Sequence, residues 1–291
     1  MMYIGDDILL HYNVDTRNPH DYKYLTNPGW SVCGREAPVS LLVLVTSGLQ
    51  HGERRRAIRQ TWGAEQLQRQ LDMRLVFLLG TAEPAQHSLE QQLGEEAAQH
   101  GDIVREDFLD SYQNLTLKTL AGIKWAGEYC PRARFVLKTD DDMYVNVGGL
   151  LDYLTAEFSS SEKLITGCVK NDPAGPHRPL PAGGPAGGPG LPFRSVHPLF
   201  MAGAGYVLSG DLLGPLYTAS LNIRLVKVED AFLTGYCARR VGGVRKVHQE
   251  RFSCGQLVGR DCDLSHSFTG HKITPARMVD IHNKLTSGNC H

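Results

Sequence analysis

Three features that would assign a chain to a familiar class are missing from this sequence. No apolar run approaches the roughly 20 residues that a membrane-spanning helix needs, and residues 1–30 are polar, unlike a secretory signal. The formal net charge is only −1, so charge does not favour nucleic acid or an anionic membrane as a partner. The seven cysteines lack the C-x-x-C spacing of zinc and redox sites. We therefore expect no nucleic-acid partner and no membrane span in this chain.

Cysteines without that spacing favour disulfides formed in an oxidising compartment. Because the count of seven is odd, at least one cysteine stays unpaired. An oxidising compartment and a missing secretory signal point in different directions. A truncated N-terminus would reconcile them.

The composition is that of an ordinary globular protein, with 42% hydrophobic and 21% charged residues over 291 positions. Residues 1–37 show no sustained period and contain Asn-Pro turn signals, which predicts an irregular stem or lead-in. We expect one domain over residues 38–291. Within it, residues 172–192 consist largely of proline, glycine and alanine. Such a composition cannot bury a core and predicts a mobile loop.

Runs rich in leucine and β-branched residues are typical of strands that are buried on both faces. They occur at Val39–Thr46, Arg74–Leu79 and Arg134–Thr139, and helical patterns lie between them. This alternation predicts an α/β fold with a mostly parallel central sheet and helices on both faces.

Three carboxylates, Asp140, Asp141 and Asp142, follow the last of these runs directly. Side chains alternate along extended backbone, so Asp140 and Asp142 face one way and Asp141 the other. A divalent cation bound to a diphosphate would neutralise two such carboxylates. A solvated acidic turn is the alternative. The position favours the cation, since ligands of open α/β sheets collect at the carboxyl ends of strands.

Arg55 and Arg59 lie four residues apart in a helical pattern and so share a face. A run of this kind is most often a solvated basic turn. Because it follows the first expected strand of the sheet, we favour contact with a nucleotide or phosphate.

Two further patterns lie nearer the C-terminus. Gly203 and Gly205 alternate along an expected strand and would bare its backbone to a flat ligand, although a bulge or tight packing is also compatible. Glu229 and Asp230 precede a helical stretch, where an acid can be a simple N-terminal cap.

The order of several motifs matches a known family. These motifs are Arg55-x-x-x-Arg59-x-Thr61-Trp62-Gly63, Asp107-Phe108-x-Asp110-x-Tyr112-x-Asn114-Leu115-Thr116-x-Lys118-Thr119, Lys138-Thr139-Asp140-Asp141-Asp142-Met143-Tyr144-Val145-Asn146, Gly203-x-Gly205-Tyr206-x-x-Ser209-Gly210 and Glu229-Asp230. Through them the chain resembles the animal β-1,3-galactosyltransferases and the related β-1,3-N-acetylglucosaminyltransferases. The resemblance implies a GT-A nucleotide-sugar transferase fold with Asp140 to Asp142 as its D-x-D motif.

The resemblance also implies roles for individual residues. Asp140, Asp142 and His271 would hold Mn2+ on the UDP diphosphate, and a nitrogen ligand beside carboxylates suits manganese. Asp230 would be the general base, with Glu229 as the fallback. The residues implied at the donor site are Arg55, Arg59, Thr61, Asp140, Asp141, Gly203 and Gly205.

The implied activity is an inverting transfer of galactose from UDP-galactose to a β-1,3 linkage on a glycan acceptor, in a glycoprotein or glycolipid. Thr139 and Glu229 favour galactose over N-acetylglucosamine. Because residues 172–192 replace an aromatic and basic segment of the relatives, a non-catalytic glycan- or nucleotide-binding protein is the third possibility. The resemblance further implies a Golgi lumen location, a Cys33–Cys130 disulfide and an N-terminal membrane anchor that this chain does not show.

Overall fold

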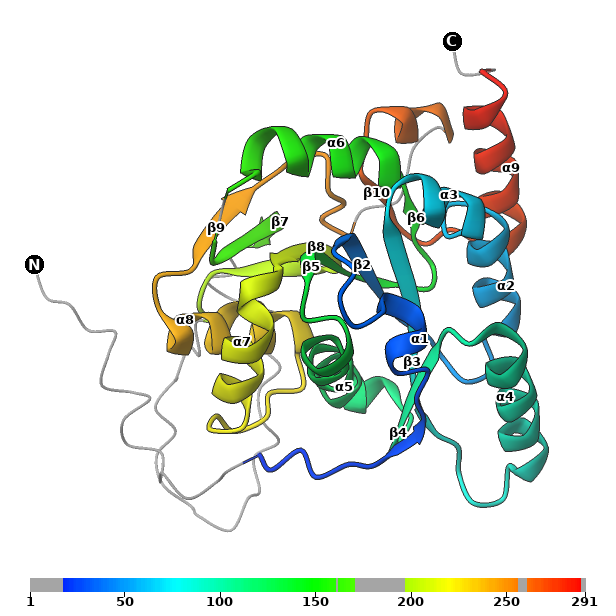
Figure 1. Ribbon diagram of the computed structural model, residues 1–291, viewed down its shortest axis with the longest axis vertical. Coiled ribbons are helices and arrows are strands. Elements are labelled where there is room, and N and C mark those ends of the chain that lie inside the picture. Colours follow the sequence, from blue (N-terminus) through cyan, green and yellow to red (C-terminus); the bar gives the residue numbers. More distant parts are fainter. Residues whose placement is uncertain (1–17, 161, 171–196, 256–260, 289–291) are drawn as a thin grey trace, which may run out of the picture.

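An eight-stranded mixed sheet forms the centre of the computed structural model, which describes residues 18–160, 162–170, 197–255 and 261–288 (Figure 1). In order across the sheet, the strands are β1 (Tyr24–Thr26), β4 (Ile103–Leu109), β3 (Met73–Thr81), β2 (Val39–Thr46), β5 (Ala133–Asp140), β8 (Phe200–Ser209), β7 (Leu164–Lys170) and β9 (Arg245–His248). The loop predicted for residues 172–192 lies outside the described residues and stays a prediction.

The parallel sheet expected from the sequence is confirmed for β4, β3, β2 and β5, which pair in parallel. β8 instead runs antiparallel to both β5 and β7, while β9 returns parallel to β7. A parallel connection needs a crossover segment, usually a helix, and the Pro/Gly-rich stretch before β8 has no helical pattern. The sheet is therefore mixed, with its parallel part around β2 and β5.

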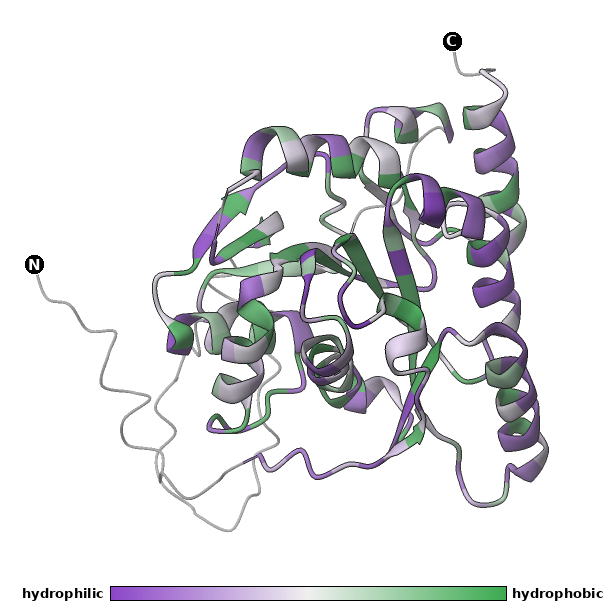
Figure 2. Cartoon of the chain, viewed as in Figure 1, coloured by the Kyte–Doolittle hydropathy of each residue, from purple (hydrophilic) through white to green (hydrophobic). Residues whose placement is uncertain are grey.

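Helices cover both faces of the sheet, as predicted. On one face, α2 (Gly52–Gln60), α4 (His87–His100), α6 (Val147–Phe158) and α9 (Pro275–Thr286) share a core with the odd-numbered residues of β2. On the other face, α5 (Leu115–Tyr129), α7 (Leu213–Ser220), the π-helical segment η3 (Ala231–Cys237) and α8 (Ala238–Val241) pack on its even-numbered residues. Figure 2 shows hydrophobic residues concentrated on the central strands, whereas outer helices such as α4 and α9 mix hydrophobic and hydrophilic residues.

Short elements complete the described chain. They are α1 (Trp30–Cys33), α3 (Glu65–Gln70), β6 (Tyr144–Val145), β10 (Thr269–Gly270), η1 (Tyr112–Asn114), η2 (Gly210–Leu212) and η4 (Asp261–Ser265). Within the described ranges, no helix has both the length and the apolar character needed to cross a bilayer.

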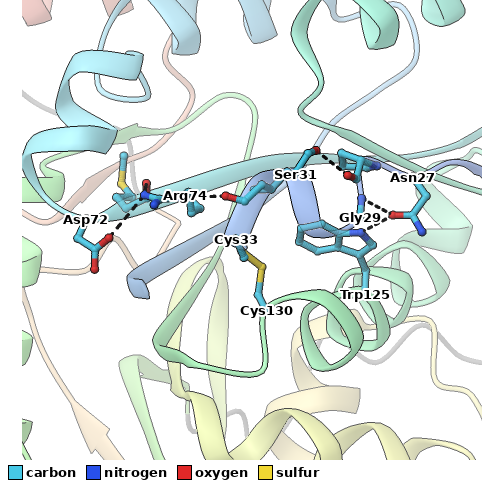
Figure 3. The surroundings of a disulfide bond; sticks show 11 residues. Asn27, Gly29, Ser31, Cys33, Asp72, Arg74, Trp125 and Cys130 are labelled. Carbon is cyan, nitrogen blue, oxygen red and sulfur yellow. Dashed lines mark hydrogen bonds and ion pairs between the residues drawn. A yellow bond between two sulfur atoms is a disulfide. The ribbon is translucent and has the colours of Figure 1, made fainter. Parts of the chain in front are cut away.

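The described part of the lead-in, residues 18–37, contains regular structure that the sequence did not predict. Of the residues expected to be irregular, β1 pairs antiparallel with β4, and α1 carries Cys33 to a disulfide with Cys130 (Figure 3). The indole Nε1 of Trp125 donates to the side-chain oxygen of Asn27 at 2.8 Å. Three residues of strand are too short to produce a recognisable period, so only contacts with the sheet and with α5 order this segment.

The predicted Cys33–Cys130 bridge is thus present, and a second bridge joins Cys168 to Cys254. Cys237 is a buried free cysteine. Burial raises the pKa of its thiol to about 12, so the thiol stays protonated at neutral pH and is a poor nucleophile.

Replacing Cys33 with serine is expected to lower the free energy of unfolding by about 2–4 kcal/mol, because the bridge closes a long loop. The sequence separation of its two cysteines is 97 residues. Denaturant titration of Cys33→Ser and of the double variant Cys33→Ser/Cys130→Ser should give the same loss, since either change breaks the same link. Unchanged stability in both variants would contradict a structural role for the bridge.

Candidate active site

The acidic triplet lies at the carboxyl end of β5, in register with the end of β2. Thr46 pairs with Asp140 across the two strands, and its hydroxyl donates to Asp140 Oδ1 at 2.5 Å. Asp140 and Asp142 are half-buried, whereas Asp141 is buried. The two faces expected from strand alternation are therefore present.

Asp141 lies inside the protein and holds the loop that follows β2. Its Oδ2 accepts hydrogen bonds from Ser47 Oγ at 2.7 Å, from the Gly48 backbone N at 3.1 Å and from His51 at 2.7 Å, and its Oδ1 pairs with Arg54 at 2.9 Å. Burial alone would raise the pKa of Asp141, but the hydrogen bonds from His51 and Ser47 hold it below its usual value. Both oxygens of Asp141 thus hold the loop after β2, and the donor contact expected of this residue stays a prediction.

Asp142 faces His271, although 129 positions separate them in the sequence. The backbone of Ile273 donates to the Asp142 carbonyl at 2.8 Å, and β10 pairs with β6 just beyond the triplet. These bonds bring His271 Nε2 to 3.8 Å from Asp142 Oδ2. Burial raises the pKa of Asp142 in spite of the nearby His271, and the charges of Asp140 and Asp141 add to the rise.

The donor set at this edge suits a divalent cation. Burial raises the pKa of Asp142, and the charges of Asp140 and Asp141 add to that rise. A cation would offset both the burial of the carboxylate and its repulsion by these neighbours. Two carboxylates and one imidazole are ligands that Mn2+ accepts. Among the residues that the structure describes, no three such side chains already converge as a preformed cage.

Lys138, which sequence reasoning did not select, connects the acidic triplet to the second acidic pair. Its Nζ lies 2.8 Å from Asp140 Oδ1, 3.2 Å from Glu229 Oε2 and 3.0 Å from the Gly203 carbonyl. The side chain is 1% exposed. Burial would lower the pKa of Lys138, but the Asp140 and Glu229 carboxylates raise it well above its usual value. A lysine inside an otherwise apolar strand, two residues before an acid, was the signal available in the sequence.

The two acids of the second pair have different surroundings. Glu229 is buried, and its Oε1 accepts from the Tyr206 hydroxyl at 2.7 Å. Burial, partly offset by Lys138, raises the pKa of Glu229. Asp230 is only half-buried; its Oδ2 accepts from the Gly203 backbone N and its Oδ1 from the Ala231 backbone N, each at 2.8 Å. Asp230 therefore caps η3, yet it is the acid of the pair that a substrate can reach.

The glycine pair on β8 serves close packing. A Cβ at Gly203 would lie 3.1 Å from Asp230 Oδ2, and one at Gly205 would lie 3.2 Å from Thr269 Cγ2. Asp230 and β10 thus cover the face that the sequence suggested for a flat ligand. Both glycines are therefore tightly packed, and at Gly203 the missing side chain lets Asp230 pack against β8.

The side chains of the basic helix make internal contacts, and the nucleotide contact expected of them stays a prediction. Arg55 is 1% exposed and bonds to Glu96 and to the carbonyls of Gly48 and Leu49. Arg59 pairs with Glu96 at 2.8 Å and with Asp102 at 2.7 Å.

Thr61 is buried, and its hydroxyl donates to the Ala57 carbonyl at 2.7 Å. All three side chains thus support α2 and the loop after β2. The more exposed basic side chains beside the triplet are His51 and Arg54, at 43% and 34%.

The mixed sheet, with acidic groups gathered at the carboxyl end of a central strand, is the arrangement expected of the GT-A nucleotide-sugar transferase fold. The profile described as Galactosyltransferase matches residues 53–250, and the chain belongs to that family.

Curated relatives agree with this assignment. The chain is 36% identical over 258 residues to "Beta-1,3-galactosyltransferase 5" of Homo sapiens, which covers 86% of this chain and 80% of the relative. It is 34% identical over 279 residues to "Beta-1,3-galactosyltransferase 1" of Mus musculus, covering 94% and 82%. A solved glycosyltransferase involved in the glycosylation of the major capsid of PBCV-1 aligns over 84% of this chain and 98% of its own, at 15% identity and a TM-score of 0.41. The protein is therefore a hexosyltransferase.

Proposed function

We propose that this galactosyltransferase is an inverting, Mn2+-dependent enzyme that moves galactose from UDP-galactose to a β-1,3 linkage on a glycan acceptor. The names of the relatives support the linkage and the sugar. The observation that carries the proposal is the position of the half-buried Asp230, which accepts a hydrogen bond from the Gly203 backbone N. Lys138 Nζ donates both to the Gly203 carbonyl and to Asp140 of the triplet. Lys138 thus links β8, which lies beside the proposed base Asp230, to Asp140, a proposed metal ligand.

In this mechanism Asp140, Asp142 and His271 would hold the metal on the UDP diphosphate. The metal, when bound, supplies positive charge to the departing UDP. Asp230 takes the proton from the acceptor hydroxyl at a carboxylate oxygen. The hydroxyl oxygen attacks C1 of galactose from the face opposite UDP, so the configuration at C1 inverts. Lys138 keeps Asp140 in place throughout.

The three functions left open by the sequence are separated by one assay. The purified protein is incubated with Mn2+ and either labelled UDP-galactose or labelled UDP-N-acetylglucosamine, against a panel of glycosides with different terminal sugars. Transfer from UDP-galactose alone supports the proposal, and linkage analysis of the product checks the β-1,3 bond. Transfer from UDP-N-acetylglucosamine would favour the related activity, and binding without transfer would favour a non-catalytic relative.

The disulfides and the family resemblance also support a proposal for the cellular location. The Cys33–Cys130 and Cys168–Cys254 disulfides fit an oxidising compartment, and the family resemblance implies the Golgi lumen. We propose that site of action, with UDP-galactose as donor and a glycoprotein or glycolipid as acceptor. Immunofluorescence of the protein expressed in animal cells against a Golgi marker tests it.

Replacing Asp142 with alanine is expected to weaken Mn2+-dependent UDP binding at least about tenfold, because it removes a proposed metal ligand. Titration calorimetry of UDP with and without Mn2+ measures the effect. Asp280→Ala on α9 is the matched control, since its carboxylate is 56% exposed and pairs with Lys284, away from the triplet in the sequence. Equal UDP affinity in both variants would remove Asp142 from the metal site.

A further inference from the structure

Apolar side chains are exposed next to the second acidic pair. Of the large hydrophobic residues that are exposed in the described ranges, four come from two segments: Leu109 is 42% exposed, Tyr112 89%, Leu225 37% and Val228 45%. Exposed apolar side chains that gather in one place mark interaction sites more often than scattered ones do. We call the surface formed by these four residues the apolar rim.

Contacts between the two segments hold the apolar rim together. Lys227 Nζ donates to Gln113 Oε1 at 3.2 Å, which joins the neighbours of Val228 and Tyr112. One turn further into α5, the Thr116 hydroxyl donates to the Val226 carbonyl at 2.8 Å. Residues that lie more than a hundred positions apart thus form one surface.

The loop that carries Tyr112 is anchored at both ends. Before it, Asp110 accepts from the Gly80 backbone N and from Lys118 Nζ, each at 2.8 Å. After it, the Asn114 side chain donates to the Leu109 carbonyl at 2.8 Å. The Tyr112 ring therefore projects from a fixed backbone, and little entropy is lost when a ligand packs against it.

The apolar rim lies beside the proposed active site. Val228 directly precedes Glu229 and Asp230 in the chain. Inside the protein, the buried Lys118 donates to the Ser47 carbonyl, and the Ser47 hydroxyl bonds to the buried Asp141, so these bonds connect the anchor of the Tyr112 loop to the triplet. A molecule whose hydroxyl reaches Asp230 would extend over this surface.

We propose that the apolar rim binds a pyranose ring of the acceptor glycan, with Tyr112 packed against the C–H face of the sugar. This inference rests on the proposed function and names its acceptor subsite. An aromatic face is electron-rich and suits the C–H hydrogens of a sugar ring, while Gln113 and Lys227 offer polar groups to its hydroxyls. A protein partner would need roughly 800 Å2 of buried surface on this side, more than four partly exposed side chains supply.

Acceptor-dependent kinetics test the subsite. Tyr112→Ala is expected to raise the KM for the acceptor about tenfold, in line with the loss of one buried aromatic contact, and to leave the KM for UDP-galactose unchanged. Tyr112→Phe keeps the ring face and should behave like the wild-type protein. Leu25→Ala, which removes a side chain that is 52% exposed on β1, is the control. An unchanged acceptor KM in Tyr112→Ala would overturn the inference while leaving the proposed function intact.

A binding measurement separates the two proposals. Saturation-transfer NMR with methyl β-glycosides of galactose and N-acetylglucosamine, in the presence of UDP and Mn2+, should show contact with wild-type protein and lose it in Tyr112→Ala. This result without any sugar transfer supports the apolar rim and overturns the proposed activity. UDP binding without any glycoside signal overturns the apolar rim, as does Tyr112-dependent self-association in sedimentation.

Discussion

Asp230→Asn is expected to lower kcat about a hundredfold or more, the typical contribution of a positioned general base, and to leave Mn2+-dependent UDP-sugar binding intact. An inverting displacement needs one group to take the acceptor proton. Glu229 is buried against Tyr206 and Lys138, which leaves Asp230 as the accessible acid of the pair. An amide at this position cannot accept that proton.

The hydrogen bonds of Asp230 predict a second, smaller effect of this variant on stability. Asp230 accepts one backbone N–H with each carboxylate oxygen, but an asparagine can accept only with its single amide oxygen. A modest fall in melting temperature is therefore expected together with the loss of turnover. Asp211→Asn is the matched variant, because Asp211 also accepts a backbone N–H, from Lys163 at 2.9 Å. Near-normal turnover in Asp230→Asn would make this residue a helix cap and move the search for a base to Glu229.

Lys138→Met is expected to lower the free energy of unfolding by about 3–5 kcal/mol, the usual cost of removing one partner from a buried ion pair. Asp140 and Glu229 would then face each other without the ammonium group that lies between them. Transfer should fall as well, since Asp140 would keep its bond from Thr46 but lose the one from Lys138 that also orients it. Chemical denaturation and initial rates measure the two effects separately.

A charge-compensated variant distinguishes positioning from simple destabilisation. In Lys138→Met/Glu229→Gln, one buried charge of each sign is removed, so much of the lost stability should return. Asp140 would still lack its partner, and the concentration of Mn2+ needed for half-maximal rate should remain raised. Recovery of both stability and Mn2+ response would show that Lys138 acts only through the stability of the fold.

Much of the framework could be predicted from local sequence. Runs of leucine and β-branched residues indicated β2, β3 and β5, because a strand buried on both faces must be apolar throughout. The acidic triplet was locatable for the same reason, since it interrupts such a run at the end of a strand. β1 has three residues, and its order depends on pairing with β4. No local sequence pattern predicts the pairing of two strands so far apart in the chain.

The sequence by itself determined the α/β class, the family motifs and the place of Asp140 to Asp142 at a strand end, because each is encoded in consecutive residues. Only the tertiary structure decided which charged groups support the site and which can reach a substrate. Arg55 is buried and pairs with Glu96, so it supports the site from inside. Lys138 links the acidic triplet to Glu229. These roles depend on the burial of individual charged side chains and on distances between residues far apart in the chain, which hydrophobic periodicity does not specify.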